Sequence, residues 1–432
     1  MSLWFEDYLI KNFGAALMGA DFTRMTFTPF VIPNVFVSTN MFPDRPGVAP
    51  DAIDYIVTYS RPEKRRLFIV TDEYSARFCN KITRAFEQRY QFKTQVWKGA
   101  MPEAPLDSIQ ECVGLVNKFE PDLIMAVGGG SVIDTSKIVW LLYERPDMQD
   151  FTSIINPIFL VGIRKKAHLI AVPTTSGTGS ECTPTSVVTD TETNRKIPVN
   201  HQELIPDYAL LDPTLPVAMP PNLTAGTGMD VLAHAVDAVL CAAANDLTDA
   251  IGLRAIQMVF KYLPRAYCDG KDREARYRMH LASSMAGMVL SQAGSGISHA
   301  MGHAFGGVFH VHHGVTVGLF LPYEIQAYAY VSDKYLEICD ALDVRVKDDR
   351  KSLANLTDKI RALMKDVNIP LSIKEAGVSR QEFEEKLDKM ADYAAADPTG
   401  VIPPPYLLTV DQFKKLYRLA YTGIDLDLGS EF

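Results

Sequence analysis

Short apolar runs, separated by glycine, proline and polar residues, dominate the first half of the chain. These runs lie at 66–72, 121–127, 168–172, 186–190 and 209–211, with a weaker alternating segment at 92–97. Runs that are apolar at consecutive positions, rather than at every second one, are typical of parallel strands buried on both faces. Segments with helical spacing lie between them, at 76–90 and 106–119. The first half is therefore predicted to alternate strands with helices around a parallel sheet.

The pattern changes at about Leu215, where long apolar segments with helical spacing replace the strand signals. These segments lie at 224–244, 250–263, 276–289, 322–342, 353–367, 382–395 and 409–421. We therefore predict an α/β domain over residues 1–214 and an all-helical domain over residues 215–432. Near the N-terminus the pattern predicts a short amphipathic helix over 5–17 and extended structure over 27–38.

Composition and charge exclude several classes of protein. An apolar fraction of 47% and a charged fraction of 22% are ordinary for a soluble globular chain. The net charge of −9 and the lack of a basic stripe exclude a nucleic-acid partner. No apolar run is long enough for a membrane span, and the N-terminus lacks the basic start of a signal peptide. Six scattered cysteines without a CxxC motif favour reduced thiols in the cytoplasm over a disulfide framework.

Histidines concentrate in the glycine-rich segment 294–323. Five of the nine histidines of the chain lie there: His299, His303, His310, His312 and His313. His299 and His303 are four residues apart, so on a helix they share one face. Imidazoles at this density favour a metal site, although core histidines bonded to backbone carbonyls are the alternative.

A second polar pair precedes this segment. Asp230 and His234 are also four residues apart, on the almost wholly apolar run 229–244. A carboxylate and an imidazole on a buried helix face need partners, because an unpaired buried charge is very costly. A divalent cation held between this run and the histidine segment would satisfy both.

Two loops in the first half could hold a nucleotide. The run 121–127 leads into Gly128-Gly129-Gly130-Ser131 and then into a helix. Glycines allow close backbone approach, and a helix N-terminus favours a pyrophosphate; a plain strand-to-helix connection is the alternative. The loop 173–181, PTTSGTGSE, offers hydroxyl and amide donors for phosphate or ribose; a solvated surface loop is the alternative.

Four motifs in this order, GGGS, PTTSGTGSE, GMDVLAHAVDA and SHAMGHAFGGVFHVHHG, resemble the iron-containing (group III) alcohol dehydrogenase family. The resemblance runs from about residue 65 to about residue 345. It implies an N-terminal Rossmann-like dinucleotide-binding α/β domain and an all-α C-terminal domain, the architecture shared with dehydroquinate synthase. It also implies a metal-dependent, NAD(H)-linked alcohol dehydrogenase or aldehyde reductase.

The resemblance assigns roles to individual residues. It implies Asp230, His234, His299 and His313 as ligands of Fe²⁺, with Zn²⁺ as the alternative metal. His303 matches a histidine near substrate and nicotinamide, and either relays a proton or only packs. His310 and His312 match no general ligand. The implied cofactor-binding residues are Asp72, Gly129, Gly130, Ser131, Asp134, Thr174, Thr175, Thr178 and Lys196. Among these, Asp72 matches the acid that holds the adenosine ribose and predicts a preference for NAD over NADP.

The chain departs from the family pattern at three places. No glycine-rich turn is found between Pro33 and Asp54. The segment 102–105 reads PEAP where many members have a PNPT-like phrase. Residues 396–403 read ADPTGVIP where many members have Cys-Thr-Gly-Gly-Asn-Pro-Arg. These departures concern the substrate pocket and the first strands, but not the metal ligands.

The helical half that would form the substrate pocket contains few cationic residues. We therefore expect the substrate to be a small neutral primary alcohol or aldehyde. The alternatives are a short hydroxy acid such as 4-hydroxybutyrate, a polyol, a lyase reaction that uses NAD transiently, and a silent metal- or nucleotide-binding scaffold. A polyol dehydrogenase would typically use one aspartate and two histidines, and a lyase would need more lysines and arginines over 224–320. The resemblance further implies a homodimer or larger homo-oligomer, with no nucleic-acid or membrane partner.

Overall fold

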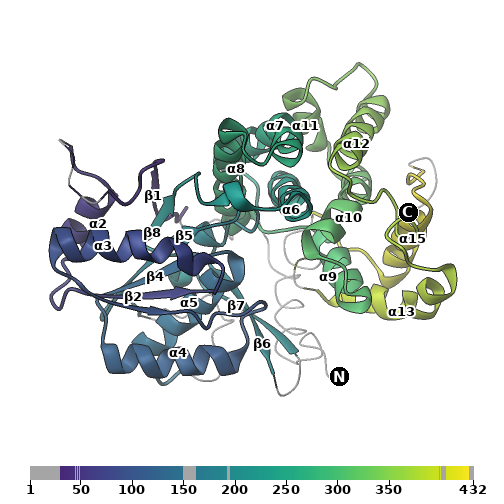
Figure 1. Ribbon diagram of the computed structural model, residues 1–432. Coiled ribbons are helices and arrows are strands. Elements are labelled where there is room, and N and C mark those ends of the chain that lie inside the picture. Colours follow the sequence, from purple (N-terminus) through teal and green to yellow (C-terminus); the bar gives the residue numbers. More distant parts are fainter. Residues whose placement is uncertain are drawn as a thin grey trace. The chain divides into compact units, whose positions relative to one another are not determined.

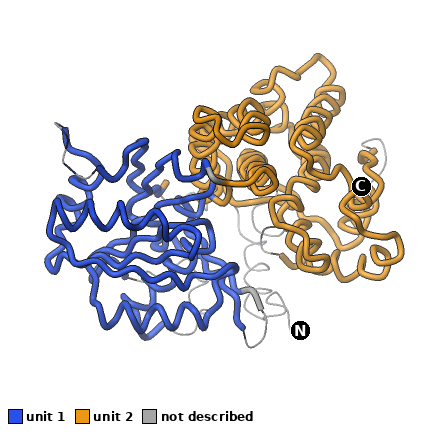
Figure 2. The backbone as a smooth tube through the Cα atoms, in the orientation of Figure 1, with its two compact units in different colours: residues 1–4, 31–175, 179–217 blue, residues 5–30, 176–178, 218–432 orange. Residues whose placement is uncertain are grey.

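The computed structural model describes residues 30–43, 45, 47, 49–148, 162–191, 195–397, 399 and 405–427. The described residues form two compact units (Figure 2). The first unit comprises Val31–Thr175 and Gly179–Val217, and the second comprises Ser176–Thr178 and the chain from Ala218 onward. The helix expected over 5–17 lies outside the described residues.

The first unit contains a six-stranded sheet in which all neighbouring strands are parallel, in the order β1-β8-β5-β4-β2-β3. Its strands are β1 (Asn34–Val37), β2 (Arg66–Thr71), β3 (Lys93–Trp97), β4 (Leu123–Gly128), β5 (His168–Pro173) and β8 (Tyr208–Leu211). The apolar runs at 66–72, 121–127, 168–172 and 209–211 and the weaker segment at 92–97 are therefore strands of a parallel sheet, as predicted, whereas the run at 186–190 forms a strand of a separate antiparallel pair. Strand β1 falls within the segment expected to be extended.

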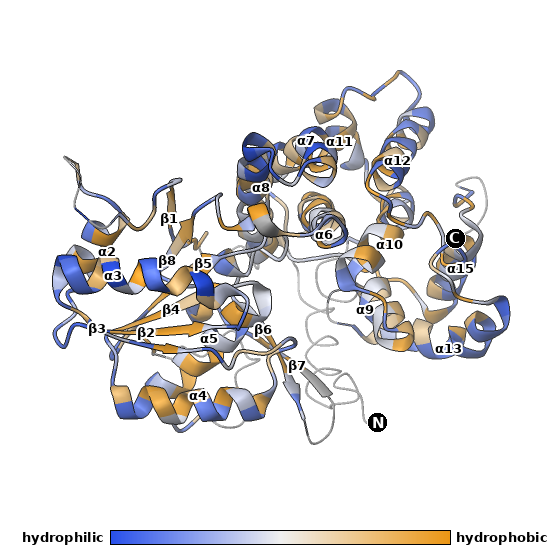
Figure 3. Cartoon of the chain, viewed as in Figure 1, coloured by the Kyte–Doolittle hydropathy of each residue, from blue (hydrophilic) through white to orange (hydrophobic). Residues whose placement is uncertain are grey.

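Helices cover both faces of this sheet (Figure 1). Along β2, Leu67 and Ile69 belong to the apolar cluster that includes α2 (Ala52–Ser60) and α3 (Cys79–Tyr90). Phe68 and Val70 point the other way, into the cluster with α4 (Leu106–Phe119) and α5 (Gly130–Glu144). All four of these side chains are buried, so the middle of the strand is hydrophobic at every position (Figure 3).

A two-stranded antiparallel sheet, β6 (Thr185–Asp190) and β7 (Arg195–Asn200), is fastened to α5 by buried polar groups. The Lys137 ammonium donates to the carbonyl oxygens of Thr183 (2.8 Å) and Thr185 (2.7 Å). Burial lowers the pKa of Lys137 to about 8, and nearby carboxylates limit this fall. Strand β7 was not predicted, because its charged residues and Pro198 interrupt the apolar pattern.

The second unit consists of helices. They are α6 (Pro221–Leu240), α7 (Asp246–Cys268), α8 (Arg273–Ala293), α9 (Ile297–Phe309), α10 (His313–Tyr328), α11 (Tyr335–Ala341), α12 (Asp349–Asp366), α13 (Arg380–Ala396) and α15 (Val410–Thr422). Helix α6 is buried from Thr224 to Leu240, because it packs against α7, α8 and α10. In the described part of the chain, no helix is long and apolar enough to cross a membrane.

One helix prediction was wrong. The segment 322–342 was expected to be a single helix, but α10 begins earlier, at His313, and ends at Tyr328, and α11 starts at Tyr335. The Ser332 hydroxyl accepts from the backbone N–H of Lys334, and the Asp333 carbonyl accepts from Leu336 N–H. Serine and aspartate favour such turns over helix interiors. The apolar residues keep a helical spacing across this turn, so the sequence pattern did not show that the helix is interrupted.

Glycines bring α6, α9 and α10 unusually close together. A Cβ atom at Gly314, in the first turn of α10, would lie 2.1 Å from the carbonyl oxygen of Gly226 on α6. A Cβ atom at Gly302, on α9, would lie 2.8 Å from the Val317 side chain on α10. These contacts leave no space for a side chain, so glycine is needed where the helices meet.

This packing predicts a position-specific response to added methyl groups. Gly314→Ala should lower the free energy of unfolding by about 1–3 kcal/mol or more, because the methyl group forces α6 and α10 apart. Gly307→Ala is the matched control, since nothing lies within 4 Å of a Cβ atom there. The control should be neutral or stabilising by up to about 1 kcal/mol. Urea unfolding of both variants tests this, and equal effects would contradict the packing argument.

Candidate functional site

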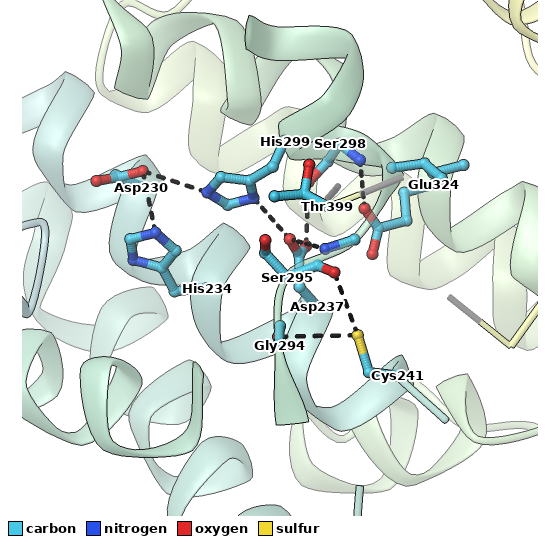
Figure 4. A network of polar contacts seen from close by, with 12 residues as sticks. Asp230, His234, Asp237, Cys241, Gly294, Ser295, Ser298, His299, Glu324 and Thr399 are labelled. Carbon is cyan, nitrogen blue, oxygen red and sulfur yellow. Dashed lines mark hydrogen bonds and ion pairs between the residues drawn. The ribbon is translucent and has the colours of Figure 1, made fainter. Parts of the chain in front are cut away.

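Three histidines surround the carboxylate of Asp230 within the second unit, and Figure 4 shows two of them, His234 and His299. The Oδ1 atom of Asp230 lies 3.7 Å from Nε2 of His234, 3.8 Å from Nε2 of His299 and 3.3 Å from Nε2 of His313. Asp230 and His234 come from α6, His299 from α9 and His313 from the first residue of α10. The structure thus brings together all four residues expected to bind the metal.

The geometry of this cluster fits a divalent ion. Atoms about 2.1 Å from an ion in tetrahedral directions are about 3.4 Å apart, close to the distances observed. The ligand atoms of Asp230, His299 and His313 all lie within 4.8 Å of one another, while His234 is outside this mutually close set. Asp230 Oδ1 and His299 Nε2 are buried without hydrogen-bond partners among the described residues. Buried polar atoms need a partner, and an ion between them would supply it.

Electrostatics also suit a cation at this point. Burial alone would raise the pKa of Asp230, but His234 and His313 hold it well below its usual range, so the group is ionised. Burial lowers the pKa of His234 to about 4, which leaves a neutral imidazole at pH 7. An ionised carboxylate beside a neutral imidazole is the state in which both groups bind metals.

A second carboxylate orients the His299 ring. The Nδ1–H of His299 donates to Oδ2 of Asp237 over 2.6 Å, which turns Nε2 toward Asp230 (Figure 4). Burial lowers the pKa of His299, but Asp237 and Asp230 outweigh burial and raise it to about 10, so Nε2 carries a proton that a bound metal ion would displace. Metal-binding histidines commonly hold such a carboxylate on their other nitrogen. Asp237 was not predicted as a site residue, although it lies three residues after His234 on the same apolar helix.

His303 stands at the edge of the cluster. Its ring stacks on His313, with centroids 5.1 Å apart, and its side chain is 42% exposed. Its Nδ1 lies 3.0 Å from Oδ2 of the buried Asp397. Asp397 also accepts hydrogen bonds from the backbone N–H and the hydroxyl of Thr399. Asp397 was not predicted as a site residue, because it lies in the C-terminal phrase where the chain departs from the family pattern.

The two remaining histidines of the segment shape the connection between α9 and α10. His310 caps α9 with a left-handed backbone (φ 57°) and is exposed. His312 precedes α10, and its Nδ1 would lie 3.0 Å from a Cβ atom added at Gly226. Neither belongs to the group of ligand atoms around Asp230.

In the first unit, the expected nucleotide residues gather at one edge of the sheet. Asp72 follows β2, Gly129 follows β4 and Thr174 follows β5, and these three strands are adjacent and parallel. The strand order changes direction between β2 and β4, because β3 lies on one side of β2 and the later strands lie on the other. In open α/β sheets, ligands bind at the carboxyl ends of strands at such a switch point.

Direct contacts connect these loops. The N–H of Thr174 donates to the Gly128 carbonyl over 2.9 Å. The hydroxyls of Ser75 and Thr174 are 3.2 Å apart, and Asp72 accepts from the Ser75 N–H over 2.6 Å. A Cβ atom at Gly129 would lie 3.3 Å from the Thr175 hydroxyl. Helix α5 begins at Gly130, with Ser131 in its first turn, so its free N–H groups start beside these loops.

Three further residues that were expected to bind the cofactor are not among those that meet at this edge of the sheet. The Asp134 carboxylate accepts from the Ser180 hydroxyl (2.7 Å) and the Val187 N–H (3.0 Å), so it holds α5 to the following loop and to β6. Thr178 belongs to the loop tip that groups with the second unit. Lys196 lies in β7, opposite Thr189, and its side chain is outside the described part of the structure.

The tip of the PTTSGTGSE loop is held by α8. The Ser176 hydroxyl lies 3.0 Å from Nδ1 of His280, and the Gly177 N–H donates to the Ser283 hydroxyl over 2.8 Å. Burial lowers the pKa of His280 to about 4, so this ring is neutral. Neither His280 nor Ser283 was predicted, since single polar residues on an apolar helix give no distinctive signal.

Comparison with known proteins gives consistent matches. Residues 45–213 match the family described as iron-containing alcohol dehydrogenase, and residues 224–421 match the C-terminal part of the Fe-containing alcohol dehydrogenase family. The NADPH-dependent butanol dehydrogenase of Clostridium saccharobutylicum is 37% identical over 332 residues, which covers 76% of this chain and 84% of the relative. The 1-propanol dehydrogenase PduQ of Citrobacter freundii is 35% identical over 310 residues, covering 70% and 79%.

Longer relatives and solved structures extend this result. The bifunctional aldehyde-alcohol dehydrogenase of Escherichia coli K12 is 32% identical over 411 residues, so 88% of this chain spans about half (45%) of that protein. An alcohol dehydrogenase structure from Oenococcus oeni gives a TM-score of 0.80 at 28% identity, covering 91% of this chain and 100% of the other. A 1,3-propanediol oxidoreductase structure gives 0.81 at 25% identity, covering 91% and 99%.

The cluster around Asp230 predicts strong and selective metal binding. His299→Ala should weaken Zn²⁺ or Fe²⁺ binding by more than about 100-fold, which exceeds the usual effect of losing an outer partner. His310→Ala is the matched control and should leave the affinity unchanged. Competition with a chromophoric chelator measures both, anaerobically for Fe²⁺. Equal affinities of the two variants would show that the metal binds elsewhere.

Proposed function

Because this chain belongs to the iron-containing alcohol dehydrogenase family, and is thus an oxidoreductase, we propose that it transfers a hydride between a small primary alcohol or aldehyde and NAD(H), using Fe²⁺. The observation that carries the proposal is the convergence of three imidazole nitrogens on Asp230 Oδ1. The relatives named as butanol and 1-propanol dehydrogenases support a short primary alcohol.

The donor set defines what the second unit contributes. One ionised carboxylate and three neutral imidazoles leave a net charge of +1 around a divalent ion, which attracts an anionic substrate oxygen. A divalent ion held here supplies Lewis-acid chemistry, lowering the pKa of an alcohol and polarising an aldehyde carbonyl. These ligands do not by themselves select iron, since zinc generally binds nitrogen and oxygen sites more tightly than Fe²⁺. The choice of iron therefore follows from the family.

His303 is the residue that we propose moves the proton. Its Nδ1 is engaged by the buried Asp397, so Nε2 is the ring nitrogen left to exchange a proton. The half-exposed ring can pass the proton on to solvent. Proton transfer by a positioned histidine typically contributes about 10²–10⁴-fold to a rate.

The first unit supplies the cofactor site in this proposal. The turn at Gly129, Gly130 and Ser131 and the start of α5 offer backbone N–H groups to the pyrophosphate. Asp72 offers a carboxylate to the ribose hydroxyls. NAD(H) held by these residues would supply the hydride-transfer chemistry. The scattered cysteines, without a CxxC motif, support a reducing compartment, and we propose a cytoplasmic homo-oligomer.

Net turnover of nicotinamide tests the proposal. Anaerobically Fe²⁺-loaded protein should oxidise NADH in the presence of a short aldehyde such as butanal or propanal. His299→Ala should lower the rate by at least about 10²–10³-fold, because the loss of Lewis-acid stabilisation amounts to several kcal/mol. The loss of NADH absorbance measures both proteins.

The same assay separates the alternatives. A lyase or a silent scaffold gives no net oxidation of NADH with any aldehyde, even when metal and NADH are bound. A panel that includes succinic semialdehyde distinguishes a hydroxy-acid dehydrogenase from an enzyme for neutral alcohols.

The choice between NAD and NADP tests the role of Asp72. The wild-type protein should prefer NAD, because a carboxylate at the ribose repels a 2′-phosphate. Asp72→Asn removes the charge but keeps an acceptor for the Ser75 N–H, and should shift the ratio of kcat/KM values toward NADP at least about tenfold. Asp72→Gly should shift it at least as far. An unchanged ratio would refute the assignment, a relevant outcome because one relative is named for NADPH.

A further inference from the structure

The loop 173–181, PTTSGTGSE, changes unit twice along its length (Figure 2). It leaves the first unit after Thr175, and the first unit resumes at Gly179. The three residues between them, Ser176–Thr178, group with the helices of the second unit. The residues directly before this tip, Thr174 and Thr175, were expected to bind the cofactor. The helical unit therefore holds the tip of a loop whose stem belongs to the candidate cofactor site.

Two polar side chains of α8 bind the tip. The Ser176 hydroxyl lies 3.0 Å from Nδ1 of His280, and the Gly177 N–H donates to the Ser283 hydroxyl over 2.8 Å. His280 and Ser283 are each 1% exposed, and Ser176 is 5% exposed. Hydrogen bonds at such depth are shielded from water, and the loss of one partner leaves the other unsatisfied. Both bonds therefore resist any movement of the tip away from α8.

Helix α6 also contacts the tip. A Cβ atom at Gly177 would lie 2.6 Å from the Cβ atom of Thr227 and 3.3 Å from its Cα atom. This distance leaves no space for a side chain, so the backbone of the tip lies directly against α6. Thr227 precedes Asp230 by three residues on the same helix. The tip thus packs about one helical turn from the carboxylate around which the three histidines gather.

The His280 ring is not explained by packing alone. Burial lowers the pKa of His280 to about 4, so the neutral ring has one donor and one acceptor nitrogen. Its Nδ1 meets Ser176, but its Nε2 is buried and has no hydrogen-bond partner among the described residues. A leucine would fill a similar space without burying an unpaired nitrogen, and would therefore favour stability. A residue that breaks this rule of core packing is expected where it serves function.

We propose that His280 is a positioning residue for the cofactor loop, and that Ser283 assists it. The bond from His280 to Ser176 and the bond from Gly177 to Ser283 fix two consecutive residues of the tip to one helix. The tip then has a single position on α8, whether or not a cofactor is bound.

The peptide bonds carry this constraint into the stem of the loop. Thr174 keeps its N–H on the Gly128 carbonyl, and Thr175 keeps its hydroxyl close to Gly129. A loop that is ordered before the cofactor arrives binds it more tightly, because less conformational entropy is lost on binding. The inference rests on the proposed function only in taking this loop as part of the cofactor site.

Hydrogen exchange tests the hold on the tip without metal or cofactor. His280→Leu should speed the exchange of a peptide that covers residues 173–181 at least about threefold, because the tip opens more often. His280→Asn should exchange like wild type, since its amide can replace Nδ1 as the partner of the Ser176 hydroxyl. If His280→Leu does not fold, Ser176→Ala removes the same bond from the other side. Unchanged exchange in the Leu and Ala variants would overturn the proposal.

NADH affinity tests the positioning role. In the Zn²⁺-loaded protein, His280→Leu and Ser176→Ala should each weaken NADH binding about three- to tenfold. The double variant should bind no more weakly than either single variant, because both remove the same bond. His280→Asn should bind within about twofold of wild type. Fluorescence titration measures NADH, and competition with a chelator should give a Zn²⁺ affinity within about threefold of wild type in every variant.

Thr357→Val is the matched control for the loss of a buried hydroxyl. Thr357 is 1% exposed, and its hydroxyl donates to the Ala354 carbonyl within α12 over 3.0 Å. Valine keeps the shape of the side chain and removes the hydroxyl. This variant should leave both the exchange of residues 173–181 and the affinity for NADH unchanged.

The other outcomes overturn the proposal in distinguishable ways. Additive losses in the double variant would mean that His280 and Ser176 act separately. Equal losses with Leu and Asn at position 280 would mean that the ring only fills space. Faster exchange with unchanged NADH affinity would mean that the hold on the tip does not position the cofactor loop. If the wild-type protein binds no NADH, the proposed function and the positioning role both fail, while the exchange data still decide whether His280 holds the tip.

Discussion

A carboxylate buried among three imidazoles is the constraint on which the second unit depends. Asp230 is almost fully buried and ionised, and its Oδ1 has no hydrogen-bond donor among the described residues. A buried, ionised oxygen of this kind needs a cation beside it. The helices therefore place the Nε2 atoms of three histidines around Asp230 Oδ1, where they can bind the same cation. The short contact between Gly226 and Gly314 follows from this requirement, since α10 delivers His313 by crossing α6 at backbone distance.

The two layers behind the donors have different physical tasks. The inner layer must leave lone pairs free, and Asp237 does this by engaging the far nitrogen of His299. The outer layer stabilises the charge of Asp237, which accepts hydrogen bonds from the Gly296 N–H and the Ser298 hydroxyl. His303 is arranged differently, because its partner Asp397 is buried while its own ring remains half-exposed.

Much of the fold could be predicted from the sequence, because a strand that is buried on both faces is apolar at consecutive positions, as at 66–71 and 123–128. The helices α4 and α15 were found almost to the residue for a similar reason. The chemistry of the metal cluster was accessible because histidines are few and i, i+4 spacing is diagnostic. The roles of Asp237 and Asp397 could not be predicted, because each depends on a contact between segments distant in sequence. The break between α10 and α11 was missed because a polar turn can interrupt a helix without interrupting its apolar spacing.

The distribution of the donors over α6, α9 and α10 has a thermodynamic consequence. An ion bound to all three helices binds only the folded unit, so it acts as a non-covalent cross-link between segments far apart in the chain. Each tenfold rise in free metal concentration above the dissociation constant then adds about 1.4 kcal/mol to the stability of the folded state. The persistence of the helical unit is thereby linked to the supply of metal in its surroundings, and a shortage of metal would reduce the amount of folded protein as well as its activity.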